Sequence, residues 1–274
     1  MRRSVRRALG VVSAVVLSAA GLTAGLVPAQ AAQVKSGTYV SLGDSLAFGY
    51  QPDLVAAGDY DPAHYVSYAE DYAAMRPHLQ VANFGCPGET TATLINGGCP
   101  WPAFALHMPY NGGSQLQAAL AYIAEHPDTS LISVDIGSND LLAILGQCGV
   151  DATCISGKLP AVLGNYAYIL GALKAAAPRA QLVVFNLYNP LALTTPGSDA
   201  LLTQYVNPAI TQLAAGFGAK VADAFTVMNH RAGSPAEAAF VCSRTWMCSW
   251  TPGNIHPTDL GYQQMAIALL HAQS

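Results

Sequence analysis

Charged residues are scarce in this sequence of 274 residues. Lys, Arg, Asp and Glu together make up 10% of it, with 12 basic residues against 16 acidic ones. A formal net charge of −4 excludes a nucleic-acid-binding protein, because such a protein needs a clustered basic footprint. Hydrophobic residues make up 52%, which is too many for a disordered chain. The composition therefore indicates a globular protein with a sizeable apolar core.

Long hydrophobic runs are also few, and the only one that approaches the length of a membrane span is residues 8–27. Four arginines precede it, and residues 28–31 (Pro-Ala-Gln-Ala) follow it. A basic start, an apolar stretch and a small-x-small end are typical of a secretory signal peptide. An uncleaved membrane anchor is the alternative, since about 20 apolar residues span a bilayer. We expect residues 1–31 to be cleaved off, which leaves a secreted, extracellular protein without a stable membrane anchor.

No linker, repeat or low-complexity tract follows residue 37, so we expect residues 32–274 to form a single domain. Runs rich in β-formers alternate with segments of helical spacing through five rounds. This alternation predicts an α/β fold, a three-layer α/β/α sandwich with a flavodoxin-like, five-stranded parallel sheet. The expected strands are residues 38–42, 79–83, 131–136, 181–186 and 220–222, and the expected helices are residues 64–75, 114–125, 160–176, 199–217 and 258–272.

The six cysteines fall as three pairs of neighbours along the chain: Cys86–Cys99, Cys148–Cys154 and Cys242–Cys248. A zinc site is the competing interpretation, but the sequence has no Cys-x-x-Cys and no His at ligand spacing beside a cysteine pair. The oxidising compartment that export implies favours disulfides, and no metal is expected. Six cysteines allow about fifteen connectivities. The sequence leaves the pairing open, and local pairing is the simplest arrangement.

Four short motifs lie where a predicted strand ends or a helix begins. A parallel sheet gathers its chemistry at these positions, because the carboxyl ends of its strands meet at one edge. The motifs are Gly43-Asp44-Ser45-Leu46, Asn83-Phe84-Gly85-Cys86-Pro87-Gly88-Glu89-Thr90, Gly137-Ser138-Asn139-Asp140 and Asn254-Ile255-His256-Pro257.

These motifs hold the groups that acyl transfer needs. Ser45 is expected on a strand-to-helix turn, and a serine hydroxyl needs an adjacent base to act as a nucleophile. His256 is the candidate base, because neutral imidazole accepts a proton at neutral pH. The backbone N–H groups of Ser45 and Gly88 and the side-chain amide of Asn139 are candidate donors for an oxyanion hole. Taken singly, each of these residues is an ordinary turn or capping residue; their combination favours catalysis.

The four motifs resemble the blocks that define the SGNH/GDSL hydrolase family, in the same order from Gly43 to Gly261. The resemblance implies a secreted or periplasmic esterase, lipase or related acyl hydrolase that needs no cofactor. It implies Ser45 as the nucleophile and His256 as the base. It also implies that Gly88 and Asn139 supply oxyanion-hole donors beside the N–H of Ser45.

The sequence departs from the family pattern at one position. Many members have an aspartate three residues before the histidine, where it holds the imidazole in the right tautomer; here that position is Gly253. Some relatives use a main-chain carbonyl instead, so the Gly253 carbonyl or a neighbouring one is the favoured partner of His256. A hidden carboxylate is the alternative, with Asp259, Asp135 and Asp223 as candidates.

Other function classes are also considered. A carbohydrate O-acetyl esterase and a non-catalytic secreted binding module are possible on the same fold. An α/β-hydrolase of the nucleophile-elbow type needs Gly-x-Ser-x-Gly, whereas the residue two after Ser45 is Ala47. A dinucleotide-binding enzyme needs a Gly-x-Gly-x-x-Gly after the first strand, which is absent. The expected partner is a small-molecule or lipid ester substrate, and the expected oligomeric state is a monomer.

The sequence says least about the substrate. Several large apolar residues follow Cys99 in a long loop, and two tryptophans flank Cys248. Such residues either line an acyl-chain pocket or pack beneath the loop that carries them. These residues are Trp101, Phe104, Met108, Tyr110, Trp246 and Trp250. Lipid esters are slightly favoured over acetylated sugars.

Overall fold

The computed structural model describes residues 37–101, 105–189, 191–230, 232–250 and 254–274. The predicted signal peptide, residues 1–31, lies outside the described residues.

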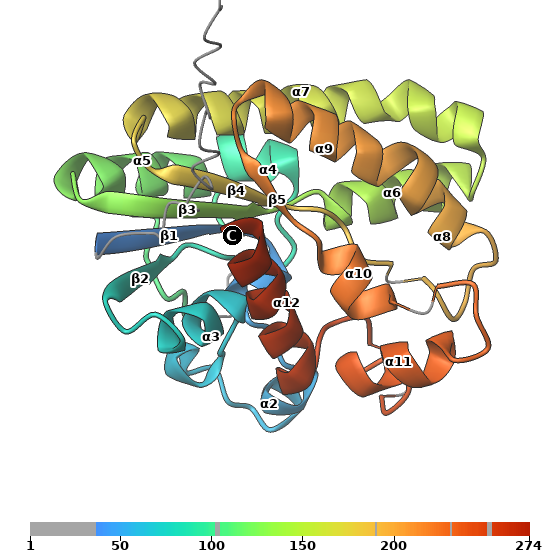
Figure 1. Ribbon diagram of the computed structural model, residues 1–274. Helices are drawn as coiled ribbons and strands as arrows, with labels where there is room; N and C mark the ends of the chain where they lie inside the picture. Colours follow the sequence, from blue (N-terminus) through green and yellow to red (C-terminus); the bar gives the residue numbers. More distant parts are fainter. Residues whose placement is uncertain (1–36, 102–104, 190, 231, 251–253) are drawn as a thin grey trace, which may run out of the picture. The chain divides into compact units, whose positions relative to one another are not determined.

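Five parallel strands form one sheet in the order β2-β1-β3-β4-β5 (Figure 1). The two central strands, β1 and β3, are almost wholly buried along their length, as expected for a parallel sheet covered on both faces. This sheet confirms the predicted fold class. The strands are β1 (Gly37–Gly43), β2 (Leu79–Asn83), β3 (Thr129–Asp135), β4 (Gln181–Phe185) and β5 (Lys220–Ala222).

Helices cover both faces of the sheet, and alternate residues of β1 show the division. Val40 and Leu42 belong to one buried cluster, whereas Tyr39 belongs to another, because successive side chains of a strand point to opposite faces. The first cluster is completed by α4 (Thr91–Asn96), α5 (Gln115–Glu125), α6 (Ser138–Cys148), α7 (Ala152–Ala176) and α9 (Asn207–Gly216). The second is completed by α1 (Ser45–Phe48), α3 (Tyr68–Ala74), α10 (Ala224–Asn229) and α12 (Asp259–Ala272).

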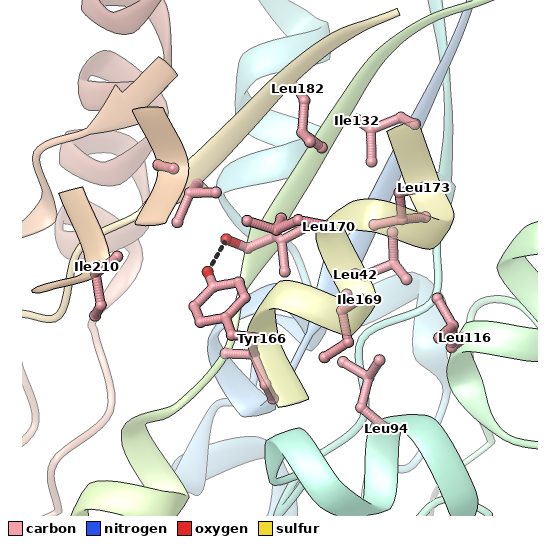
Figure 2. Close-up of a cluster of buried hydrophobic side chains, with 14 of the residues drawn as sticks. Leu42, Leu94, Leu116, Ile132, Tyr166, Ile169, Leu170, Leu173, Leu182 and Ile210 are labelled. Atoms are coloured by element: carbon pink, nitrogen blue, oxygen red, sulfur yellow. Dashed lines mark hydrogen bonds between the residues drawn. The ribbon is translucent and has the colours of Figure 1, made fainter. Parts of the chain in front are cut away.

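The first cluster is built around α7, whose apolar side chains meet those of the strands (Figure 2). The hydroxyl of Tyr166 on this helix donates to the Val134 carbonyl of β3 at 3.2 Å, so the one polar atom that this face of the helix buries is satisfied. The labelled aliphatic side chains include Ile169, Leu170 and Leu173 of α7 and Leu42, Ile132 and Leu182 of the strands.

Three helices begin or run differently from the sequence-based expectation. The helix expected from residue 64 begins at Tyr68, because Ser67 caps it: the Ser67 hydroxyl accepts from the Ala69 N–H at 3.0 Å, and Glu70 accepts from the Ser67 N–H at 3.0 Å. The helix expected over 199–217 is divided into α8 (Ser198–Leu201), a π-helical turn η2 (Leu202–Val206) and α9. Pro208, which lacks an N–H, is the second residue of α9, just after that turn.

Several helical elements begin outside the ranges expected from the sequence. They are α1, α4, α6, α10, α2 (Pro52–Ala56), the 3-10 turn η1 (Pro62–His64) and α11 (Glu237–Arg244). In addition, α7 begins at Ala152 rather than at residue 160, since Asp151 caps it and Pro160 is accommodated inside it.

The three cysteine pairs lie at bonding distance in the local connectivity, with Cα–Cα distances of 5.8 Å for Cys86–Cys99, 5.6 Å for Cys148–Cys154 and 5.3 Å for Cys242–Cys248. The first joins the second motif, through Cys86, to the chain after α4. The second joins the end of α6 to the start of α7, and the third joins α11 to the chain before His256. Within the described ranges, no helix is both long and apolar enough to cross a membrane.

Candidate active site

The turn that carries Ser45 follows β1 at the carboxyl edge of the sheet. Asp44 caps the short helix α1 by accepting from the Leu46 N–H at 2.9 Å. Gly43 has a φ of +151°, and a Cβ there would lie 2.0 Å from the Asp135 carbonyl oxygen, so only glycine lets β1 turn this close to β3. Gln115 clamps the same glycine, since its side chain accepts from the Gly43 N–H at 2.7 Å and donates to the Gly43 carbonyl at 2.9 Å.

His256 lies 211 positions later in the sequence, just before α12, and its Nε2 is 2.9 Å from the Ser45 Oγ. Its segment is held on two sides. The backbone N–H of Trp246 donates to the His256 carbonyl at 2.9 Å, next to the antiparallel bridge between Thr245 and Pro257. The Tyr188 hydroxyl donates to the Ile255 carbonyl. The ring of Tyr50 packs against the imidazole with centroids 4.3 Å apart. The structure thus brings together the predicted nucleophile and base.

The other ring nitrogen of His256 faces a side chain to which the sequence analysis gave no role. Asn254 Oδ1 lies 2.7 Å from His256 Nδ1 and also accepts from the His256 backbone N–H at 3.0 Å. The favoured partner, the Gly253 carbonyl, lies outside the described residues.

Two of the three carboxylates considered as alternatives have other hydrogen-bond partners in the described part of the chain. Asp259 accepts from the Gln51 side chain at 2.7 Å. Asp223 caps α10 through the Thr226 N–H at 3.0 Å. Asp135 is buried at the end of β3, where burial and the charge of Asp44 raise its pKa. No hydrogen bond joins any of them to His256 among the described residues.

The imidazole is neutral and has a defined tautomer. Burial lowers the pKa of His256 to about 4, because the charged form is poorly solvated there. The amide oxygen of Asn254 can only accept a hydrogen bond, so Nδ1 carries the proton. Nε2 therefore presents its lone pair, and the Ser45 hydroxyl donates to it. This is the arrangement in which a histidine can take a proton from a serine.

The second and third motifs lie against the same pocket as Ser45. Asn139 Nδ2 donates to the Glu89 carbonyl at 2.8 Å, and Asp140 accepts from the Thr91 N–H at 2.8 Å and from its hydroxyl at 2.7 Å. These bonds lock the two motifs together. One further amide hydrogen remains on Asn139, since a side-chain amide has two.

The backbone N–H groups of Ser45 and Gly88 make no hydrogen bond with any residue that the structure describes, and Gly88 has a φ of +85°. Both residues line the pocket together with Asn139. The three predicted oxyanion-hole donors are therefore gathered around one space beside the Ser45 hydroxyl.

The pocket has a volume of about 190 Å³, and most of its lining beyond these groups is aromatic or aliphatic. Its apolar lining comes from seven residues: Leu46, Tyr50, Pro87, Trp101, Leu142, Tyr188 and Ile255.

The large apolar residues singled out in the sequence divide between the pocket and the packing beneath it. Trp101 lines the pocket and is 44% exposed. Met108 packs against the first core cluster, and the buried Tyr110 donates its hydroxyl to the Phe84 carbonyl at 2.5 Å. Trp246 donates to Gln51 at 2.7 Å, and Trp250 makes an edge contact with Trp246. Phe104 lies outside the described residues.

Three carboxyl groups are buried beneath the site, and of these only Asp135 was considered from the sequence. Burial raises the pKa of Asp44 to about 7 and that of Glu89 to about 7. Burial, together with the charge of Asp44, also raises the pKa of Asp135 well above its usual range. One oxygen of each group lacks a hydrogen-bond partner among the described residues. Over the same residues, no group of three or more His, Cys, Asp or Glu is placed to hold a metal ion.

A model of the GDSL-like lipase/acylhydrolase family matches residues 41–264. The chain belongs to this family. The match contains all four motifs, so the resemblance drawn from them is confirmed, and membership identifies the chain as a hydrolase. Among curated proteins, none matches this sequence.

Solved structures of lipases and esterases share the fold of this hydrolase. A phospholipase A1 from Streptomyces albidoflavus is 22% identical, with 88% of this chain and 100% of that one covered and a TM-score of 0.58. An extracellular lipase from Streptomyces rimosus is 19% identical, with 86% and 99% covered and a TM-score of 0.54. An acetylxylan esterase from Geobacillus stearothermophilus is 15% identical, with 87% and 94% covered and a TM-score of 0.53.

The pKa of His256 can be measured without reference to any reaction. We expect its ring to titrate near pH 4 in NMR spectra, because burial lowers the pKa of His256 to about 4. His64 provides the control in the same sample, since its exposed ring contacts Asp59 at 2.7 Å and its pKa is raised by that carboxylate. A midpoint for His256 at or above that of His64 would contradict the buried environment described above.

Proposed function

We propose that this GDSL-family protein is a secreted serine ester hydrolase, an esterase or lipase that acts on carboxylic acyl esters without a metal or cofactor. One observation carries the proposal: the Ser45 hydroxyl donates to a neutral His256 at 2.9 Å, in an apolar pocket that also holds the N–H groups of Ser45 and Gly88 and the Asn139 amide. A nucleophile, its base and a set of oxyanion donors are the parts that acyl transfer requires.

In the first half of the reaction, His256 Nε2 takes the proton from the Ser45 Oγ while this oxygen attacks the carbonyl carbon of the ester. The negative charge moves to the carbonyl oxygen, where the N–H groups of Ser45 and Gly88 and the Asn139 amide stabilise it. When the tetrahedral intermediate collapses, the imidazolium gives its proton to the departing alkoxide. The products of this half are a free alcohol and an acyl group on Ser45.

The second half repeats these roles with water as the nucleophile. His256 takes a proton from water, the hydroxide oxygen attacks the acyl carbon, and the same three donors hold the oxyanion. Collapse breaks the bond to the Ser45 Oγ, which takes the proton back from the imidazolium. The carboxylic acid leaves, and the neutral His256 and the Ser45 hydroxyl are restored.

Substitution of the proposed nucleophile and one oxyanion donor tests this mechanism. We expect Ser45→Ala to abolish turnover of a p-nitrophenyl ester, and Asn139→Ala to lower kcat by about 10²–10³-fold, the usual effect of losing one such donor. Ser156→Ala and Asn96→Ala are matched controls, because both side chains are exposed and hydrogen-bond only within their own helices. No turnover of any acyl ester by the wild-type protein would instead favour the non-catalytic binding module.

An apolar acyl chain is the part of the substrate that the pocket suits best. Its lining beyond the reacting groups is contributed by aromatic and aliphatic side chains, with Trp101 half-exposed at its edge. Burying methylene groups of an acyl chain against such a surface makes binding more favourable, whereas an acetyl group on a sugar offers only one methyl group to bury. The fold is shared by a phospholipase A1 and by an acetylxylan esterase, so the fold does not choose between these substrates.

A series of esters from acetyl to palmitoyl tests the acyl preference. We expect kcat/KM to rise by about fourfold for each methylene that the pocket buries, from about 0.8 kcal/mol per methylene, and to stop rising once a pocket of about 190 Å³ is filled. Trp101→Ala should lower kcat/KM for the longer esters and leave kcat/KM for the acetyl ester unchanged. Tyr205→Ala, at an exposed side chain, should leave kcat/KM unchanged for both. Highest activity on acetylated xylan would favour the carbohydrate O-acetyl esterase.

We also propose that residues 1–31 are a signal peptide and that residues 32–274 are the single hydrolase domain. The basic, apolar and small-residue order of that segment supports this, as do the three disulfides and the likeness to an extracellular lipase. N-terminal sequencing of the protein recovered from culture medium should begin at Ala32. A secreted chain that still begins at Met1 would contradict the cleavage.

A further inference from the structure

We propose that Asn254 is the positioning residue of His256, and that its neutral amide oxygen takes the place that a carboxylate holds in a Ser-His-Asp triad. This inference rests on the proposed function of the Ser45–His256 pair. The position is two residues before the histidine, not three, and the side chain is an amide, so neither the spacing nor the residue type of the family pattern applies.

The carbonyl oxygen of Asn254 is held in place by the backbone. It accepts from the His256 backbone N–H at 3.0 Å, which closes the Asx turn that asparagine forms with the residue two positions on. The same oxygen accepts from His256 Nδ1 at 2.7 Å. One atom therefore ties the backbone and the ring of the histidine together, so that the orientation of the imidazole follows from the conformation of this turn.

The two bonds also settle which atom of the amide faces the ring. The His256 backbone N–H can only donate, so its partner must be the amide oxygen and not the nitrogen. The oxygen in turn requires a proton on Nδ1. Asn254 thus fixes the tautomer in which Nε2 can accept from the Ser45 hydroxyl, which is the orienting part of the role that aspartate has in a triad.

The titratable groups around His256 come from several elements, and each has another described partner or faces away from Nδ1. Asp44 accepts from the Leu46 N–H, and Asp259 accepts from Gln51. The Tyr188 hydroxyl donates to the Ile255 carbonyl, and the Tyr262 hydroxyl donates to the Tyr50 carbonyl at 2.9 Å. Tyr50 itself contacts the face of the imidazole through its ring. Asn254 is the partner of Nδ1 within the described residues.

A neutral acceptor has a different effect from a carboxylate. It orients the ring, but it contributes no negative charge to stabilise the imidazolium, so burial alone acts and the pKa of His256 falls to about 4. The base consequently stays unprotonated in mildly acidic solution. With an asparagine at this position, the acid limb of activity is set by burial of the imidazole and lies well below the ordinary histidine range.

Two substitutions of Asn254 separate orientation from charge. In Asn254→Asp the acceptor keeps its place and gains a charge, so the acid limb of kcat/KM and the NMR titration of His256 should both move up by about 1–3 pH units. In Asn254→Ala the acceptor is lost, so kcat should fall by roughly tenfold to a hundredfold, with KM changed less than about twofold.

Asn186→Ala is the matched control. Asn186 also makes two side-chain hydrogen bonds, to Asp223 and from the Phe225 N–H, but it does not line the pocket. We expect this variant to keep the wild-type kcat and pH profile. Thermal unfolding of all the variants shows whether a loss of kcat comes from lost folding.

The inference is overturned if Asn254→Asp leaves the His256 titration at its wild-type position, or if Asn254→Ala lowers kcat no more than Asn186→Ala does. Its failure is distinct from failure of the proposed function. If the inference fails, the wild-type protein still shows esterase activity that depends on Ser45, while the Asn254 variants show no specific effect. If the proposed function fails, no ester is hydrolysed at all, and the NMR titration still reports whether Asn254 controls the pKa of His256.

Discussion

The hydrogen bond between the Ser45 hydroxyl and His256 Nε2 is the interaction on which the candidate site depends. Its two residues are 211 positions apart, so most of the fold lies between them. Ser45 is placed by the turn after the central strand β1, which Gln115 clamps from α5. His256 is placed by the segment before α12, which packs on the opposite face of the sheet. The sheet is therefore the frame that sets the distance between nucleophile and base.

Burial determines the charges at this edge of the sheet. The imidazole is kept neutral by a lowered pKa, and the carboxyl groups beneath it have raised pKa values, so both kinds of group are driven toward their uncharged forms. A developing oxyanion would meet the fixed dipoles of the Ser45 and Gly88 N–H groups in a poorly solvated pocket, where such dipoles act most strongly.

The fold and the main candidate site residues were accessible from the sequence because both have local signals. Strand and helix periods repeat every few residues, and each motif lies at a strand end, where a parallel sheet concentrates its chemistry. The role of Asn254 was not accessible in this way. It depends on an Asx turn that aims one oxygen at both a backbone N–H and a ring nitrogen, and an asparagine in a loop has many alternative conformations.

The substrate-facing residues were predictable only as a group, for a related reason. Trp101 lines the pocket, whereas Tyr110, nine positions later, is buried with its hydroxyl on the Phe84 carbonyl. Both are large aromatic residues in one loop with no periodic pattern. Which of them faces the pocket is decided by long-range contacts, such as the bond from Gln115 to the Tyr110 hydroxyl at 2.9 Å, that no local spacing records.

The wide separation of Ser45 and His256 also has a consequence in time. A ribosome that has completed the sheet has still not supplied the histidine, since His256 follows β5 and precedes only α12. A chain synthesised only as far as β5 cannot hold the pair, and a chain that has lost its last helix loses the packing that places the base. Hydrolytic competence would then appear in a single late step, which makes turnover a direct report on completion of the fold.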